Sequence, residues 1–108
     1  MFKLLNNESK QAYTLNEYIM EKLDDEIILY LTTENKVLSM NETASYIWGE
    51  LVHANTLDSV IDEESIINGM MKFFKYDASL SQTVACDIKD IIGMLINSNA
   101  IIDAHDTL

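Results

Sequence analysis

The hydrophobic period of this chain changes abruptly at residue 41, and this change constrains the fold more than any other feature. Before it, residues 13–40 hold apolar, β-prone runs separated by short polar turns. After it, apolar residues recur every three or four positions, which is the spacing of an amphipathic helix. Asn41 stands at the boundary, where its side-chain oxygen can accept a hydrogen bond from a first-turn amide. The sequence therefore predicts a strand that ends at Met40 and is followed at once by a helix.

Three strands are expected before that boundary, at residues 17–23, 26–31 and 36–40. Short polar turns separate them, which favours an antiparallel meander. Asn35 is the expected residue of positive φ in the second turn, because that turn contains no glycine. Both alternating sets of residues 26–31 are apolar, so this strand is expected to be central and covered on both faces.

Three helices are expected after the boundary. The first carries an apolar stripe from Ala44 to Val52, and Gly49 marks either its end or a close approach of a neighbour. The second begins near Asp62, and the third follows a cap at Ser81 or Thr83. Asn97, Ser98 and Asn99 are expected to end the third helix, and residues 100–103 to add a short strand.

Taken together, these elements predict an α+β fold, winged helix-turn-helix-like, with a three-stranded antiparallel sheet followed by three helices and a short terminal strand. The folded domain is expected over residues 13–104. Residues 1–12 show no hydrophobic period and are expected to form a loose N-terminal arm. Residues 105–108 are expected to form a frayed tail.

The charge balance restricts the partners. Eighteen acidic residues face seven basic ones, all of them lysine, and the net charge is −11. Nucleic-acid affinity depends on neutralised phosphates and on arginine contacts to guanine, so nucleic acid is not an expected partner. The net negative charge would also repel an anionic membrane surface, so no membrane partner is expected. It favours a cationic peptide or protein as the partner.

Reactive constellations are missing from the sequence. His53 and His105 lie far apart without a partner at metal-ligand spacing, and Cys86 has no histidine nearby in sequence. Asp87 and Asp90 share one helical face, where solvated acids are far commoner than catalytic pairs. We therefore expect no enzyme activity, no metal and no cofactor. The start of the chain lacks a signal-peptide pattern and no apolar run is long enough to span a bilayer, so a cytoplasmic location is expected.

The strand-to-helix boundary resembles a pattern of the PqqD family, the coenzyme PQQ synthesis protein D family. In that pattern a strand ends in Leu-Asn, followed by a small residue and then Ile-Trp or Ile-Leu. Here the matching residues are Met40-Asn41, Thr43-Ala44 and Ile47-Trp48. The closing pattern of the family is matched by Tyr76-Asp77, Val84, Asp87-Ile88, Leu95 and Ile101-Ile102.

The resemblance implies a RiPP recognition element, which binds the leader segment of a ribosomally made precursor peptide and presents it to a modifying enzyme such as a radical SAM protein. The leader would add as a strand beside residues 36–40 and face the third helix. The site residues implied are Lys36, Val37, Leu38, Ser39, Met40, Asp87, Asp90, Ile91 and Met94. Trp48 is expected to fill the core.

Two other interpretations stay open at this point. One is a small adaptor subunit that binds another protein without any leader. The other is a winged-helix DNA-binding regulator, which the acids of the third helix disfavour. An exposed strand edge would also permit a homodimer.

Overall fold

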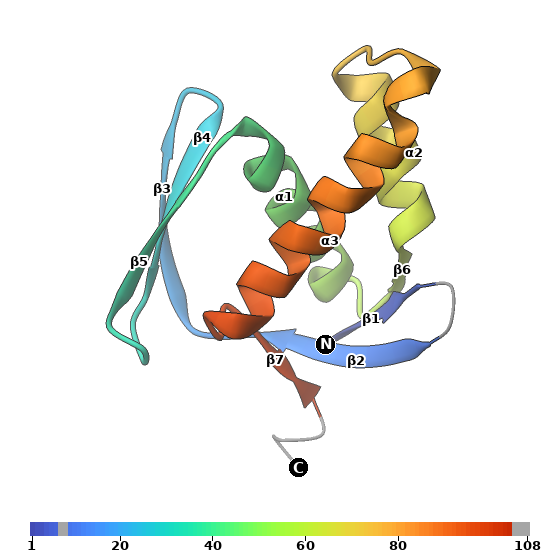
Figure 1. Cartoon of the computed structure of the whole chain (residues 1–108). Coiled ribbons are helices and arrows are strands. Elements are labelled where there is room, and N and C mark those ends of the chain that lie inside the picture. Colours follow the sequence, from blue (N-terminus) through green and yellow to red (C-terminus); the bar gives the residue numbers. More distant parts are fainter. Residues whose placement is uncertain (7–8, 105–108) are drawn as a thin grey trace.

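The computed structural model describes residues 1–6 and 9–104 of the chain and has an α+β fold. Within this part, seven strands form two sheets and three α-helices pack against them (Figure 1). The expected class and the order of meander, helices and short terminal strand are confirmed. The tail at 105–108 lies outside the described residues.

The expected meander is the smaller sheet, built from β3 (Tyr18–Leu23), β4 (Glu26–Leu31) and β5 (Lys36–Met40) in the order β3-β4-β5. Both pairings are antiparallel. Asp24 and Asn35 adopt φ angles of 53° and 51° in the two turns, which confirms the expectation for Asn35. Their short polar side chains tolerate this left-handed backbone better than most residues do.

The two faces of this sheet differ, so the expectation that β4 is covered on both faces is wrong. Leu29 and Leu31 are fully buried, whereas Ile28 and Tyr30 are half-exposed. Side chains alternate between the faces of a strand, and all three helices lie on one side of the sheet (Figure 1). The outer face therefore keeps an exposed apolar row in which Ile19 and Val37 flank Tyr30 in register.

The N-terminal segment is not a loose arm, which corrects the expectation for residues 1–12. It contains β1 (Phe2–Leu5) and the start of β2 (Lys10–Leu15). These strands pair with β6 (Val60–Asp62) and β7 (Ile101–Asp103) in a four-stranded sheet of order β6-β1-β2-β7. Phe2 and Leu4 point into the core and are 1% and 5% exposed. β1 is too short to show a hydrophobic period. Besides β2 it pairs with β6, which comes from the middle of the chain, so no local pattern predicts it.

The first two helices, α1 (Glu42–Thr56) and α2 (Glu63–Phe73), begin where the sequence predicts. Asn41 caps α1, and Asp62 caps α2 by accepting a hydrogen bond from the Glu64 N–H at 2.8 Å. α1 runs through Gly49, so the interpretation that this glycine ends the helix is wrong.

The third helix, α3 (Ser81–Asn97), begins differently from the expectation. Neither Ser81 nor Thr83 caps it, because a 3₁₀ turn at Ala78–Leu80 leads directly into its first turn. The side chain of Asp77 caps that 3₁₀ turn instead, accepting from the Ser79 N–H at 3.1 Å. The C-terminal end is as expected, since Asn99 has φ 63° and the chain then enters β7.

Trp48 fills the core between the smaller sheet and the helices, as expected. Its side chain is 1% exposed, and Tyr18 of β3 packs edge-on against it with ring centroids 5.3 Å apart. Ile47 and Leu51 beside it are fully buried. Within residues 1–6 and 9–104, no helix has both the length and the apolar character that a membrane crossing requires.

Candidate peptide-binding groove

The outer edge of β5 is the first element of the candidate site. β5 pairs with β4 along one edge, and no described strand pairs with its other edge. An edge strand presents unpaired backbone N–H and C=O groups that can bind an added strand. The resemblance to the PqqD family implies this edge as the place where a peptide would add.

A surface groove lies between this edge and α3, which here is called the β5–α3 groove. It has a volume of about 720 Å³ and is open to solvent. Its lining combines two residues of β5 with the C-terminal half of α3 and the residue that follows it: Lys36, Leu38, Lys89, Asp90, Gly93, Met94, Asn97 and Ser98. An extended segment added to β5 would therefore have helix side chains opposite it.

Four of the residues implied by the resemblance meet in this groove. Lys36 and Leu38 contribute from β5, and Asp90 and Met94 from successive turns of α3. Leu38 and Met94 are half-buried apolar side chains that pack against the core. The core holds them in place, and their exposed parts present apolar surface to the groove. They form the apolar part of the groove.

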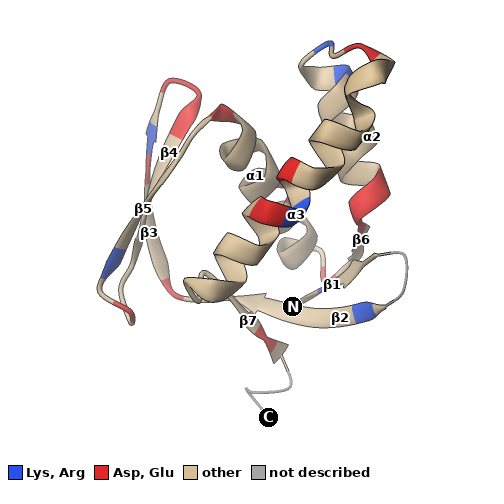
Figure 2. Ribbon diagram, viewed as in Figure 1, with Lys and Arg blue, Asp and Glu red and all other residues tan. Residues whose placement is uncertain are grey.

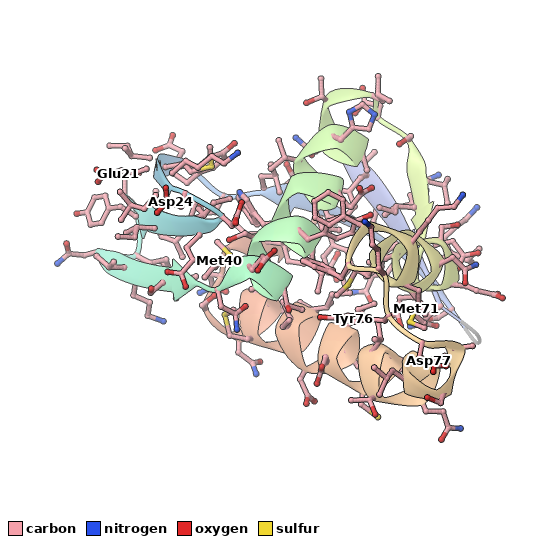
Figure 3. The ribbon with its side chains drawn as sticks, turned by 90° about the horizontal axis from the view of Figure 1, so that it is seen from above. Glu21, Asp24, Met40, Met71, Tyr76 and Asp77 are labelled. Carbon is pink, nitrogen blue, oxygen red and sulfur yellow. The ribbon has the colours of Figure 1, made fainter. Side chains whose placement is uncertain are left out.

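The other implied residues are placed elsewhere. Val37 and Ser39 are exposed and alternate with Leu38, which puts their side chains on the other face of the sheet. Met40 is 1% exposed and belongs to the core at the junction of β5 and α1 (Figure 3), so only its backbone remains for a peptide. Asp87 is exposed and Ile91 is half-buried, and neither lines the groove.

Sequence reasoning missed four lining residues: Lys89, Gly93, Asn97 and Ser98. A signal for them exists, because residues four apart on a helix share a face. Lys89, Gly93 and Asn97 follow that spacing, and Ser98 follows Asp90 and Met94 at the same interval. Once Asp90 and Met94 are assigned to a groove, helical spacing identifies the rest.

Gly93 is the most informative of these residues. Glycine inside a helix costs about 1 kcal/mol relative to alanine. Outside its own helix backbone and chain neighbours, a Cβ atom at this position would meet no described atom within 4 Å, so no close contact with another part of the fold demands glycine here. What the missing side chain leaves is free space in the groove wall, beside Met94.

The charges of the groove are mixed. Lys36 and Lys89 bring positive charge to it, and Asp90 brings negative charge. Acidic and basic residues also lie side by side on α3 in Figure 2. A bound segment could therefore place charges of both signs along the groove.

Groups for other chemistry are dispersed. Cys86 is a free, exposed thiol. In the part of the chain that the structure describes, no three or more histidine, cysteine and acidic side chains come together as a metal site would require.

Comparison with known proteins gives one informative match. No protein-family model matches the chain, and no curated protein matches it. Among solved structures, the chain is similar to TbiB1 in complex with the TbiA(beta) leader peptide, with a TM-score of 0.65. The match is 19% identical and covers 82% of this chain and 93% of that one.

At that identity the likeness concerns the fold alone. The chain therefore shares its fold with a protein that was solved in complex with a leader peptide. The PqqD family itself stays a prediction.

Proposed function

We propose that this chain is a non-catalytic recognition domain that binds the leader segment of a ribosomally made precursor peptide. The leader adds as a strand along β5, between residues 36–40 and α3, and the domain presents it to a modifying enzyme. A PqqD-like role beside a radical SAM enzyme in the cytoplasm is the specific form of this proposal.

The observation that supports it most is the unpaired edge of β5 facing the lined groove of α3. Backbone groups of the edge bind any extended peptide, and the side chains opposite select among sequences. Here Leu38 and Met94 offer apolar surface, Gly93 offers space, and Lys36, Lys89 and Asp90 offer charges. The preferred leader has an apolar side chain for that space, with charged residues on either side of it.

Binding is expected to be reversible. Ordering a flexible leader takes on the order of 2–5 kcal/mol from the gross interaction free energy. A dissociation constant near 1 μM corresponds to about −8 kcal/mol. Affinity of that order would hold the leader during modification and release it afterwards.

A DNA-binding role has little support by comparison. α3 would be the helix inserted into a groove of DNA, yet it exposes Asp87 and Asp90 and only one lysine, Lys89. The net charge of −11 would repel phosphates. The adaptor role differs from the proposal only in its partner, so an experiment with a leader peptide separates the two.

The test is an NMR titration of the isotope-labelled chain with the synthetic leader of a short open reading frame adjacent to its gene. We expect saturable amide shifts on residues 36–40 and 89–98. We also expect slower hydrogen exchange for alternate amides of β5, because successive residues of a strand point their backbone groups to opposite edges. A scrambled leader of the same composition controls for charge attraction.

Two matched variants give this test its specificity. Leu38→Asp places a charge in the apolar part of the groove and should weaken leader binding at least tenfold, or about 1.4 kcal/mol. Leu57→Asp changes an equally apolar residue, 60% exposed at the end of α1 and outside the groove lining, and should leave affinity unchanged. Equal affinity for both variants, or shifts confined to other surfaces, would refute leader binding at the β5–α3 groove.

A further inference from the structure

A second hollow lies at the opposite edge of the smaller sheet, and here it is called the β3–α1 hollow. Its volume is about 330 Å³. β3, α1 and the end of α2 form its walls, and β3 is the end strand on the side away from β5. A leader bound along β5 would leave this hollow free.

The walls of the β3–α1 hollow are rich in large apolar and aromatic side chains. Met20 and Phe73 are 46% and 65% exposed and both line the hollow, so apolar surface is exposed on two of its walls. Tyr46 packs against Phe73 and Phe74 with ring centroids 5.2 and 5.8 Å away. An aromatic-walled hollow at the surface is the kind of site that receives an anchoring side chain at protein interfaces.

Gly49 keeps the α1 side of the hollow open. It lies in the middle of α1 and lines the hollow, and outside its own helix backbone and chain neighbours a Cβ there would meet no described atom within 4 Å. Gly69 of α2 differs, because a Cβ there would lie 2.6 Å from the Tyr46 Oη. Gly69 is thus explained by packing, whereas no packing contact accounts for Gly49 or Gly93, each of which lines a hollow.

Trp48 adds an unused hydrogen-bond donor to this wall. Its side chain is 1% exposed, and its Nε1 is buried without an acceptor among the described residues. A buried N–H without a partner destabilises a fold by about 1–3 kcal/mol. Such unsatisfied groups call for an explanation, and functional sites are one of the recognised ones.

The charge around the mouth indicates which partner fits. Asp25 and Glu42 line the hollow together with a single lysine, Lys22. Further acids lie on the same β3–β4 hairpin, among them Glu21 and Asp24 (Figures 2 and 3). Apolar walls inside an acidic mouth favour an apolar side chain flanked by basic residues. A second copy of this chain docked through the same hollow would bring its own acidic hairpin against the first and be repelled.

We infer that the β3–α1 hollow is a docking site for a partner protein that inserts a leucine-sized or aromatic side chain flanked by arginine or lysine. This site is separate from the β5–α3 groove and does not depend on what that groove binds. The β3–α1 hollow could then hold a partner protein while the β5–α3 groove holds a peptide.

The first test uses three short probes and NMR of the labelled chain: acetyl-Arg-Phe-Arg-amide, acetyl-Arg-Ala-Arg-amide and acetyl-Glu-Phe-Glu-amide. A single anchoring residue should bind with a millimolar dissociation constant, so titration runs to about 10 mM. We expect saturable shifts of the Trp48 indole and the Gly49 amide with the first probe alone. Equal shifts with all three probes, no shift with the first, or shifts centred on residues 89–98 would overturn the inference.

The second test exploits the matched pair of glycines. Gly49→Leu should fill the β3–α1 hollow and abolish binding of acetyl-Arg-Phe-Arg-amide, while leader affinity stays unchanged. Gly93→Leu should instead weaken leader binding and leave the binding of acetyl-Arg-Phe-Arg-amide unchanged. At both positions a Cβ meets open space, and thermal unfolding verifies that each leucine variant is folded. Retention of probe binding by folded Gly49→Leu would refute the hollow as the site, whatever the leader does.

Discussion

The side-chain Oδ1 of Asn41 accepts a hydrogen bond from the backbone N–H of Ala44 at 2.9 Å. This bond satisfies one of the free amides at the start of α1, immediately after β5 ends at Met40. It therefore fixes the angle at which the candidate edge strand meets the helix that carries Trp48. The capping bond thus lies directly after the candidate edge strand.

Replacing Asn41 with alanine should lower the free energy of unfolding by about 1 kcal/mol, because an amide of α1 loses its acceptor. Urea denaturation measures this loss. Asn41→Asp keeps the acceptor and should stay close to the natural chain. Equal losses for the two substitutions would show that the cap does not act through its side-chain oxygen.

Alanine at either open glycine should stabilise the domain. Gly49→Ala and Gly93→Ala each remove the helix cost of glycine, and each new Cβ meets free space. We expect a gain of about 1 kcal/mol in the free energy of unfolding for each variant. Chemical denaturation checks the gain, and a loss at either position would mean that the glycine serves the fold itself.

Alanine at Gly69 should have the opposite effect. Its Cβ would lie 2.6 Å from the Tyr46 Oη, and the Tyr46 ring packs against both Phe73 and Phe74. Overpacking of this kind costs about 1–3 kcal/mol, which outweighs the helix gain. Adding Tyr46→Phe removes the clashing hydroxyl and should restore stability. A double variant no more stable than Gly69→Ala would contradict this contact.

The two acids of α3 should differ in leader binding. Asp90 lines the β5–α3 groove, whereas Asp87 is exposed outside it. If Asp90 meets a basic residue of the leader, Asp90→Lys should weaken binding by up to about fivefold, or 1 kcal/mol, as surface charge pairs do. Asp87→Lys should change it less. Isothermal titration calorimetry at low salt measures the leader affinity of both variants. A larger effect at Asp87 would indicate that the peptide lies closer to the start of α3.

Stability should fall in alkaline solution because of two tyrosines. Burial, the charge of Glu50 and a hydrogen bond to Glu50 raise the pKa of Tyr46 above 10.0. Burial and the charges of Asp103 and Glu63 raise the pKa of Tyr13. The fold thus favours the neutral phenols, so their contribution is complete below pH 10.0 and is lost as the pH rises through the raised values.

The matching measurement is urea denaturation at a series of pH values above neutrality. Tyr13→Phe and Tyr46→Phe should each make the alkaline decline less steep, since phenylalanine has no proton to lose. A decline of unchanged slope in both variants would assign the pH dependence to other groups.

Local features of this fold follow from the sequence by itself. Asn41 as a cap, Asn35 as a turn residue and the strand of residues 36–40 each depend on residues within a few positions, so spacing and side-chain chemistry predict them. The edge position of β5 also follows, because it is the last strand of a meander.

Only the tertiary structure decided which side chains share a site. β5 and the second half of α3 are distant in sequence, so only their packing brings Leu38 to the same groove as Gly93. Met40 of the same strand is buried in the core and does not line the groove. The strand at Phe2–Leu5 needed partners from the middle of the chain and from its neighbour β2, and no local pattern encodes such pairing. Long-range contacts are stabilised by burial of apolar surface. This effect is non-directional, so residue spacing along the chain does not predict which segments come together.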